Sequence, residues 1–359
     1  MNQASFAQRF NRPLQIIVMG TGPFAVPMFA ALCRSGQKIL AVVTRPDRTA
    51  AGRRPPHNPL REAAAAAGLP ILDPERINDP ETIAALTQLA PDLFVVCDYG
   101  QILAPAVLSL AAWGGINLHG SLLPRHRGAA PVQWAILSGD EISGVSVIHM
   151  TPTLDAGAVI VAQSTPIQPH ETAVELEQRL AAMGAGAVQE AIQRLHAAAC
   201  HAAEQTGEQT GEQTAEQLRV GTPQDPTHAT HARRLTKADG VVDWSLSAAS
   251  IERMRRALEP WPRTTTFLMR GGSQQLQRLV LEDVAVAQVG PQSVRPAVGT
   301  VLAAAESGIL VACGEATALL IRQLIPEGRR SMSAAEFLCG HALPVGTLFQ
   351  PSPARPTSH

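Results

Sequence analysis

Two polar side chains near the middle of the sequence have the types and the spacing needed to act on a carbonyl group. Asn117 and His119 lie in the segment GINLHG, whose apolar residues are typical of a buried strand. Residues two apart in a strand point to the same face of its sheet. An amide donor and an imidazole on one face can stabilise a carbonyl oxygen that gains negative charge, and the imidazole can also move protons near neutral pH. A satisfied polar pair at a strand end is the structural alternative.

A carboxylate that could complete this pair lies further along the chain. Asp155 is part of the segment LDAG, which follows the apolar run GVSVIHM. An Asp in an Asp-x-Gly turn usually only forms the turn. Its catalytic role would be to orient His119 and to accept a proton from the attacking group. The spacing does not show whether Asp155 reaches His119, so both interpretations stay open at this level.

A glycine-rich turn near the start of the chain indicates a different function. Residues 20–25, GTGPFA, directly follow the apolar segment IIVM and satisfy the G-x-G-x-x-A dinucleotide fingerprint, with Asp47 downstream as a candidate ribose ligand. An NAD-dependent oxidoreductase is therefore one hypothesis. The fingerprint is weak, because many strand–turn–helix units need Gly in the tight turn. In addition, Asp47 follows Arg45 and Pro46 in a loop-like segment and does not stand at a strand end.

The segments that position these residues alternate between strands and helices. Short runs rich in Val and Ile are bounded by Gly, Pro or Asp, and helix-forming stretches lie between the earlier runs. Such alternation predicts an α/β fold with an open, mostly parallel, Rossmann-like sheet, whose ligands bind at the carboxyl ends of the strands. The predicted strands are QIIVMG, ILAVVT, DLFVVC, GGINLHG and GVSVIHM, and the predicted helices are FAVPMFAALCRSG, PLREAAAAAG and PETIAALTQLA.

A change of composition divides the chain into two domains. Apolar residues at helical spacing predict one long helix over 170–197. The low-complexity repeat EQTGEQTGEQTAEQ follows, and it has no apolar residue larger than Ala with which to form a core. We therefore predict a catalytic domain over 12–197, a linker over 198–232 and a second domain over 233–350.

The second domain has a different pattern, with several short strands joined by Gly-containing turns. A hairpin is expected around residues 305–308, and SMSAAEFLCG reads as a closing helix with Ser333 and Glu336 as its capping box. Many short strands in a domain of this size predict a small β-barrel, which we expect to be OB-like.

Composition narrows the class of protein. The formal net charge is −1, so any RNA-binding surface must come from a local concentration of positive charge. The five cysteines are odd in number and scattered, which argues against a disulfide framework and a zinc site and for a reducing, cytoplasmic location. No metal is expected, because no His, Cys or carboxylate cluster has ligand spacing. No stretch approaches the roughly 20 apolar residues that span a bilayer.

The segment NLHGSLLPRHRGAAP, followed by LDAG, resembles the formyltransferases that use 10-formyltetrahydrofolate. The resemblance extends through GTGPFAVP, TRPDR, PDLFVVCDYGQIL and, beyond the linker, LTKADGVVDWSLSAASIERMRRALEPWP and SMSAAEFL. It implies Asn117, His119 and Asp155 as catalytic residues and 10-formyltetrahydrofolate as formyl donor. The folate contacts that it implies are Ser121, Leu122, Leu123 and Pro124.

The acceptor is the amine that distinguishes members of this family. The second domain resembles the barrel of the members that formylate methionyl-tRNA, which implies initiator methionyl-tRNA as the partner. The loop TRPDRTAAGRRPP would then meet phosphates or unpaired bases at the acceptor end of the tRNA. The tRNA-binding residues predicted there are Arg45, Arg48, Arg53 and Arg54. Formyl transfer to an amino-sugar nucleotide and a non-catalytic RNA- or folate-binding module are the alternatives.

Four positions depart from the family pattern. Gly22 and Pro23 stand where a Pro and an acidic residue are usual, and His126 replaces an aromatic residue. Asp98 stands where the family has a small apolar residue, close to the expected pterin pocket. These departures concern ligand contacts more than the three predicted catalytic residues.

Overall fold

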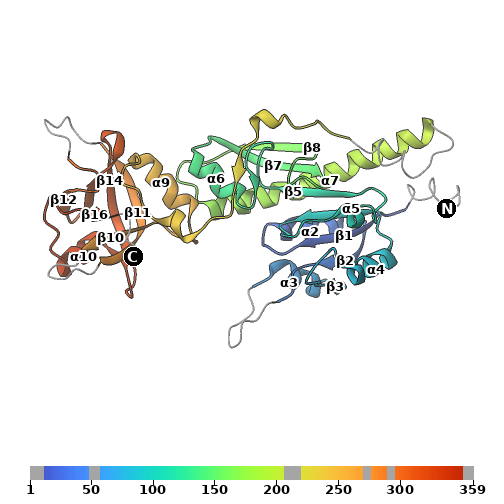
Figure 1. The fold of residues 1–359 in the computed structure, drawn as a ribbon, viewed down its shortest axis with the longest axis horizontal. Coiled ribbons are helices and arrows are strands. Elements are labelled where there is room, and N and C mark those ends of the chain that lie inside the picture. Colours follow the sequence, from blue (N-terminus) through green and yellow to red (C-terminus); the bar gives the residue numbers. More distant parts are fainter. Residues whose placement is uncertain (1–11, 48–56, 206–219, 270–275, 289–295, 351–359) are drawn as a thin grey trace, which may run out of the picture. The chain divides into compact units, whose positions relative to one another are not determined.

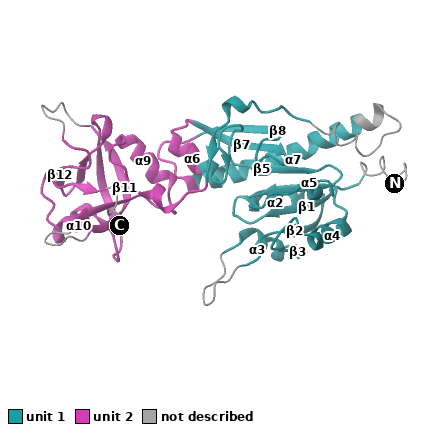
Figure 2. Ribbon diagram, viewed as in Figure 1, with its two compact units in different colours: residues 1–132, 142–166, 175–233 teal, residues 133–141, 167–174, 234–359 magenta. Residues whose placement is uncertain are grey.

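The chain divides into two compact units (Figure 2). A computed structural model describes residues 12–47, 57–205, 220–269, 276–288 and 296–350. The first unit comprises residues 1–132, 142–166 and 175–233, and the second comprises residues 133–141, 167–174 and 234–359.

The first unit contains a seven-stranded sheet with the order β3-β2-β1-β4-β5-β7-β8 (Figure 1). Five neighbouring strands, from β3 to β5, are parallel, whereas β7 and β8 run antiparallel at one edge. The prediction of a mostly parallel sheet is confirmed. The strands are β1 (Gln15–Gly20), β2 (Lys38–Val43), β3 (Ile71–Leu72), β4 (Leu93–Cys97), β5 (Gly115–His119), β7 (Ile142–His149) and β8 (Val159–Pro166).

The central strands are apolar along their whole length because both faces of the sheet are covered. Every residue of β4 is buried, and in β1 only Gln15 is partly exposed. A parallel sheet in this position has continuous apolar strands and no alternation of polar and apolar residues. Ile17, Met19 and Phe94 belong to the resulting core cluster. This rigid centre carries β5, and therefore Asn117 and His119, at fixed positions.

Helices connect the parallel strands. Helix α3 begins with Pro at its first turn, and the side chain of Asn58 accepts a hydrogen bond from Arg61 N at its start. The connecting helices are α2 (Ala25–Arg34), α3 (Pro59–Ala66), α4 (Pro80–Leu89) and α5 (Pro105–Leu108). Helix α6 (Pro131–Ser138) precedes the antiparallel strand β7, and α7 (Ala173–Gln205) follows β8. Within the described part of the chain, no helix combines the length and the apolar character that crossing a membrane requires.

The structure gives detail at both ends of the predicted linker. Helix α7 continues to Gln205, which is already inside the repeat, and residues 206–219 lie outside the described residues. Residues 220–232, which we call the strap, form hydrogen bonds with other parts of the first unit. Val159 and Thr222 exchange two backbone bonds of 2.9 Å, and strand β9 (His231–Ala232) pairs with β6 (Arg127–Gly128). The strap also contains the 3-10 helix η1 (Pro226–His228).

The second unit is built on an antiparallel sheet with the order β12-β13-β14-β11-β10-β16, with β15 attached to β14. Its two ends are joined, because Val301 N donates to Thr347 O at 2.8 Å and Phe349 N donates to Gly299 O at 2.9 Å. The curled sheet therefore closes on itself, as expected for a small OB-like barrel. The strands are β10 (Thr265–Met269), β11 (Leu276–Ala287), β12 (Val301–Ala305), β13 (Gly308–Ala312), β14 (Ala318–Pro326), β15 (Met332–Ser333) and β16 (Phe349–Gln350).

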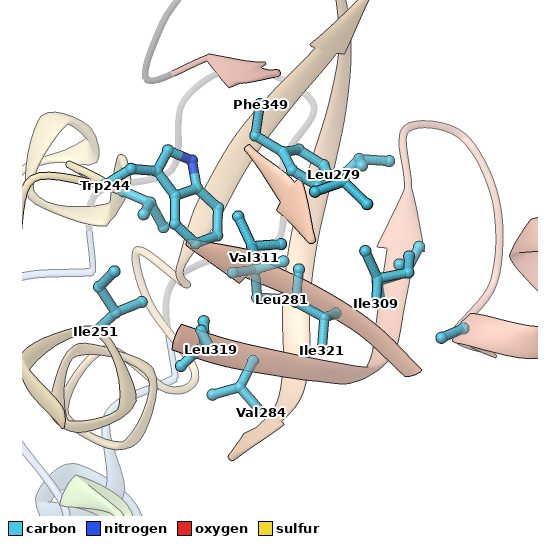
Figure 3. Packing of buried hydrophobic residues seen from close by; sticks show 14 of the residues in the cluster. Trp244, Ile251, Leu279, Leu281, Val284, Ile309, Val311, Leu319, Ile321 and Phe349 are labelled. Atoms are coloured by element: carbon cyan, nitrogen blue, oxygen red, sulfur yellow. The ribbon is translucent and has the colours of Figure 1, made fainter. Parts of the chain in front are cut away.

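The barrel interior is filled by side chains from the strands and from α9 (Ala248–Ala257) (Figure 3). Trp244 and Phe349 pack with ring centroids 5.7 Å apart, and Trp244 Nε1 donates to Thr266 Oγ1 at 3.1 Å. The buried indole N–H thus has a partner, as the interior of a barrel requires.

Two local predictions for the second unit are also confirmed. Ala305 pairs with Gly308 across the tight turn of a hairpin. Helix α10 (Ala334–Gly340) begins with the expected capping box, in which Ser333 Oγ accepts from Glu336 N and the Glu336 carboxylate accepts from Ser333 N. The unit also contains two separate 3-10 helices, η2 (Lys237–Gly240) and η3 (Gly314–Ala316).

Candidate active site

Strand β5 presents Asn117 and His119 at the carboxyl end of the parallel part of the sheet. Asn117 pairs with Val96 of β4 on one side and with Ile148 of β7 on the other, so its backbone is fixed. Its side chain is half-buried and forms no hydrogen bond within the described residues. An amide group held in this way can donate to a ligand without first losing a protein partner.

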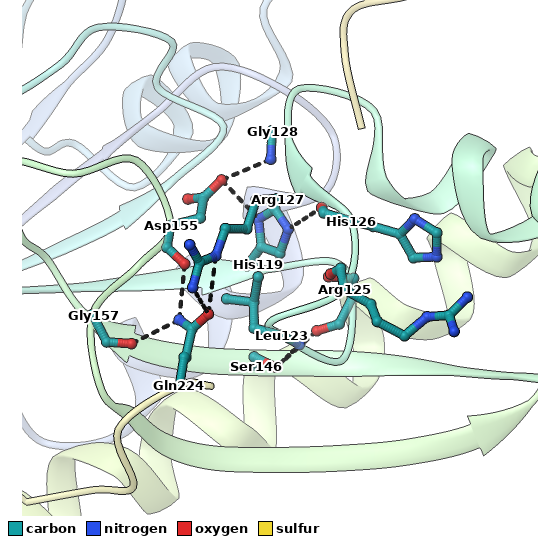
Figure 4. Close-up of polar contacts among 11 residues, drawn as sticks. His119, Leu123, Arg125, His126, Arg127, Gly128, Ser146, Asp155, Gly157 and Gln224 are labelled. Atoms are coloured by element: carbon teal, nitrogen blue, oxygen red, sulfur yellow. Dashed lines mark hydrogen bonds and ion pairs between the residues drawn. The ribbon is translucent and has the colours of Figure 1, made fainter. Parts of the chain in front are cut away.

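The two ring nitrogens of His119 have different surroundings (Figure 4). Nε2 lies 2.9 Å from the carbonyl oxygen of His126, which requires the proton to be on Nε2. Nδ1 lies 3.8 Å from Asp155 Oδ2, beyond hydrogen-bond distance but within ion-pair range. Both side chains are buried, with 6% and 9% of their surface exposed. Nδ1 is therefore the nitrogen that remains available to a ligand.

The loop that carries Asp155 is shaped by close backbone approaches. Asp155 has φ +49°, in the left-handed region, and its Oδ2 accepts from Gly128 N at 2.9 Å. Gly128 has φ +124°, and a Cβ there would lie 2.6 Å from Ala232 O. A Cβ on Gly157 would lie only 1.8 Å from His149 O. Only glycine fits at either position, and both glycines fix where the carboxylate lies.

A glutamine that sequence reasoning missed holds the same loop. Gln224 Nε2 donates to Asp155 O at 2.8 Å and to Gly157 O at 2.7 Å (Figure 4). Its Oε1 accepts from Arg127 Nε at 3.1 Å and from Arg127 Nη2 at 2.6 Å. Gln224 lies within the segment predicted to be linker, and nothing in its local composition indicates a role.

The turn after β5 is tied to the edge strand of the sheet. Ser121 is buried, and its hydroxyl donates to Arg125 O at 2.7 Å. Ser146 of β7 accepts from Leu123 N at 3.1 Å and donates to Ser121 O at 2.8 Å. The peptide bond between Leu123 and Pro124 is cis. Leu122, Leu123 and Pro124 are half-buried, so they keep surface for a ligand, whereas the Ser121 hydroxyl already has a partner within the turn.

Asp98 adds a third carboxylate close to the pair. It follows β4 with φ +52°, and Thr21 Oγ1 donates to its carbonyl oxygen at 2.7 Å. Burial raises the pKa of Asp98, the charge of His119 opposes this rise and the charge of Asp155 adds to it. The residue as a whole nevertheless keeps an exposed surface. Asp98 is thus directed toward the site.

The glycine-rich turn borders a cavity of about 770 Å³ at the carboxyl ends of β1 and β2. Asp47 lies beyond the end of β2 and forms an ion pair with Arg61, with 3.5 Å between Oδ1 and Nε. It is therefore not placed as the ribose-binding carboxylate of a dinucleotide site. The cavity is lined by Thr21, Gly22, Pro23, Arg45, Pro46, Asp47, His57, Asn58, Pro59, Glu75 and Gln101.

Of the four predicted tRNA-binding arginines, only Arg45 is described. Its guanidinium donates to Tyr99 O at 3.1 Å and to Gly100 O, so part of its donor capacity is used within the protein. Arg48, Arg53 and Arg54 lie outside the described residues. In the second unit, several arginines also have protein partners. These are Arg253 with Ser250, Arg255 with Glu282 O, and Arg256 with Glu252 and Glu171 O.

Comparison with known proteins identifies the family. A family model described as "Formyl transferase" matches residues 14–192, and one described as "Formyl transferase, C-terminal domain" matches residues 234–342. A methionyl-tRNA formyltransferase of Rhodopirellula baltica is 42% identical over 344 residues, which cover 94% of this chain and 97% of that protein. The chain belongs to the methionyl-tRNA formyltransferase family. A second member of the family, from Desulfotalea psychrophila, is 36% identical over 94% of this chain and 96% of its own length.

Two solved structures share the fold at lower identity. An N-formyltransferase from Helicobacter canadensis, in complex with folinic acid and dTDP-3-aminofucose, has a TM-score of 0.57 and 14% identity, and the match covers 86% of this chain and 98% of that chain. HypX from Aquifex aeolicus, in complex with tetrahydrofolic acid, has a TM-score of 0.53 and 14% identity over 90% of this chain. The present chain spans about half of HypX, 47% of its length. At this identity both structures show the fold of the formyltransferase family alone.

Proposed function

We propose that this formyltransferase moves the formyl group of 10-formyltetrahydrofolate to the amino group of methionine on initiator methionyl-tRNA. The observation that carries the proposal is the buried His119–Asp155 pair at the carboxyl end of β5. Asn117 lies two residues before His119 on the same strand, and its side chain has no hydrogen-bond partner among the residues that the structure describes. Two relatives that are 42% and 36% identical over nearly the whole chain are methionyl-tRNA formyltransferases, which supports this acceptor. We infer that the reaction takes place in the cytoplasm, as a step of translation initiation.

The proposed reaction is a direct transfer with no covalent enzyme intermediate. The neutral methionyl amine attacks the formyl carbon, a new carbon–nitrogen bond forms, and the bond from that carbon to the folate nitrogen breaks. Asn117 and the Nδ1–H of protonated His119 stabilise the oxyanion of the tetrahedral intermediate, since Nε2 already donates to His126 O. Asp155 accepts a proton from the attacking amine. This proton is then transferred to the leaving folate nitrogen.

The segment after β5 is the proposed folate contact. Leu122, Leu123 and Pro124 offer half-buried apolar surface, and Ser121 contributes to the shape of the turn through its bond to Arg125 O. Asp98 follows β4 at the same carboxyl edge of the sheet, because β4 and β5 are parallel, and would face the pterin ring from there. No group of three or more potential metal ligands occurs among the residues that the structure describes, and the proposed chemistry uses none.

Replacing His119 with Ala tests the catalytic part of the proposal. One oxyanion donor contributes typically ~10²–10³ in rate and general acid–base catalysis ~10²–10⁴, so turnover should fall by several orders of magnitude. The affinity for the folate should change little, because the predicted folate contacts lie in the following turn. Turnover within tenfold of the wild type would contradict the assigned role of His119.

A competition assay tests the acceptor. The protein is given 10-formyltetrahydrofolate together with charged initiator tRNA and an amino-sugar nucleotide, and both products are measured. We expect formylation of the tRNA. Formylation of the sugar alone would keep the three catalytic residues but assign the chain the sugar-directed activity of a structural neighbour. Folate binding without any formyl transfer would support a non-catalytic binding module.

A further inference from the structure

We propose that Gln224 is a positioning residue, which fixes the catalytic carboxylate of Asp155 through hydrogen bonds to the backbone of its loop. This inference rests on the proposed function of the His119–Asp155 pair. It concerns a residue of the strap, far in sequence from both catalytic side chains.

The amide group of Gln224 uses its full hydrogen-bonding capacity in this role. Its two N–H donors serve the carbonyl oxygens of Asp155 and Gly157, and its oxygen accepts both bonds from Arg127. An amide has two donors and one oxygen with two lone pairs, so no capacity remains. The partners also fix the orientation of the amide, because carbonyl oxygens can only accept and a guanidinium can only donate.

Gln224 joins two segments that both hold the catalytic carboxylate: the loop that carries Asp155 and the segment that contains Arg127. Asp155 and Gly157 belong to the loop before β8, and Arg127 precedes Gly128, whose N–H donates to Asp155 Oδ2. Gln224 therefore connects the main chain at Asp155 with the Arg127–Gly128 segment, which binds the Asp155 side chain. In Figure 4, Gln224 lies between Arg127 and the carbonyl groups of the Asp155 loop.

The rest of the strap holds His119 from its other side. Thr230 Oγ1 accepts from His126 N at 2.8 Å, and His126 O is the group that accepts from His119 Nε2. Arg127 N also donates to Thr230 O at 2.9 Å. The strap thus contacts both loops that define the His119–Asp155 geometry, and the 3.8 Å separation of that pair depends on both.

The decisive experiment compares Gln224→Glu with Gln224→Met in the full-length protein. Glutamate keeps the acceptor for Arg127 but loses the two donors, whereas methionine loses all four bonds at similar side-chain length. A displacement of about 1 Å can cost roughly 100-fold in rate, so we expect kcat to fall about 10- to 100-fold in both variants. KM for both substrates should stay within about threefold, because Gln224 touches neither. His228→Ala, at an exposed position of the same strap, is the control and should match the wild type.

A second readout tests the position of Asp155 without reference to the acceptor. The amide signal of Gly128 in an NMR spectrum reports the bond from Gly128 N to Asp155 Oδ2. It should move in both Gln224 variants and stay in place in His228→Ala. If the wild type fails to formylate charged tRNA, the proposed function is wrong, and this signal still decides whether Gln224 positions Asp155.

Three results would overturn the inference. One is a Gln224→Glu variant with wild-type kcat, since it would show that only the bond to Arg127 matters. Another is a Gln224→Met variant whose loss is confined to KM. The third is an unmoved Gly128 amide signal in both variants.

Discussion

A single aspartate shows how the site departs from an ordinary surface. The pKa of Asp98 is raised by burial, so the folded protein holds this proton more tightly than the unfolded chain does. As pH rises above the ordinary Asp value of about 3.9, the unfolded state releases the proton first and the free energy of unfolding falls. Asp98→Asn should therefore raise the melting temperature at neutral pH, and the gain should shrink as the pH is lowered toward about 4.

Thermal melts between pH 8 and pH 4 check this prediction. Glu306→Gln, at an exposed position in the β12–β13 hairpin turn, is the control that removes a charge without removing a crowded carboxylate. A gain for Asp98→Asn that is the same at all pH values would contradict the raised pKa as its cause.

The sequence predicted chemistry at residue scale better than it predicted geometry. Asn117 and His119 are two residues apart in a strand, so their placement on one face can be predicted from the local sequence. The separation of 3.8 Å between His119 and Asp155 arises from turns at Gly128 and Gly157, which depend on contacts made in the folded chain. Gln224 could not be found in this way, because its partners are main-chain atoms of distant residues.

At the scale of elements, the closure of the second unit depends on a strand of two residues. Phe349 is 2% exposed, packs on Trp244 and donates the backbone bond to Gly299 that joins the sheet ends. Removal of a buried Phe ring costs typically ~3–5 kcal/mol, so Phe349→Ala should lower the free energy of unfolding of this unit by that amount.

Chemical denaturation measures this loss, with the tryptophan fluorescence of Trp244 in the barrel core as the signal. Leu348→Ala is the matched control, because Leu348 precedes Phe349 but is 47% exposed. We expect the control to cost less than about 1 kcal/mol. Equal losses for the two variants would mean that burial of the Phe349 ring does not stabilise the closed sheet.

Long elements were predictable and short ones were not. The five predicted strands of the first unit and the hairpin of the second are present because each has several residues of regular pattern. Strands β6, β9 and β16 have two residues each, which is too few to show a period in the sequence. They form only because they pair with strands elsewhere in the fold. Strand β8 has a polar half facing solvent and was missed for that reason.

At the scale of the whole molecule, binding of tRNA by a chain of net charge −1 requires a local source of positive charge. The loop with Arg53 and Arg54 is the predicted source. Each phosphate contact contributes about 0.7–0.9 to the slope of log affinity against log salt. Replacing both arginines with Ala should therefore weaken binding and flatten this slope by roughly 1.4–1.8 if each meets one phosphate.

The matched control removes the same charge elsewhere in the first unit. Arg34→Ala with Arg76→Ala alters two exposed arginines outside the loop, and the slope should stay at its wild-type value. An unchanged slope in the Arg53 and Arg54 variant would show that this loop does not meet phosphates. Binding is measured with charged initiator tRNA at several salt concentrations.

The strap also determines when during synthesis the proposed catalytic pair is completed. Ribosomes add roughly 5–20 residues per second, so Gln224 is made about 3–13 s after Gly157 of the loop that it holds. During that interval the nascent chain already contains β5 and the Asp155 loop, but the carbonyl oxygens of Asp155 and Gly157 have no Gln224 side chain to bond. A chain interrupted between α7 and the strap would therefore carry all three predicted catalytic residues and still lack the contact that sets their geometry.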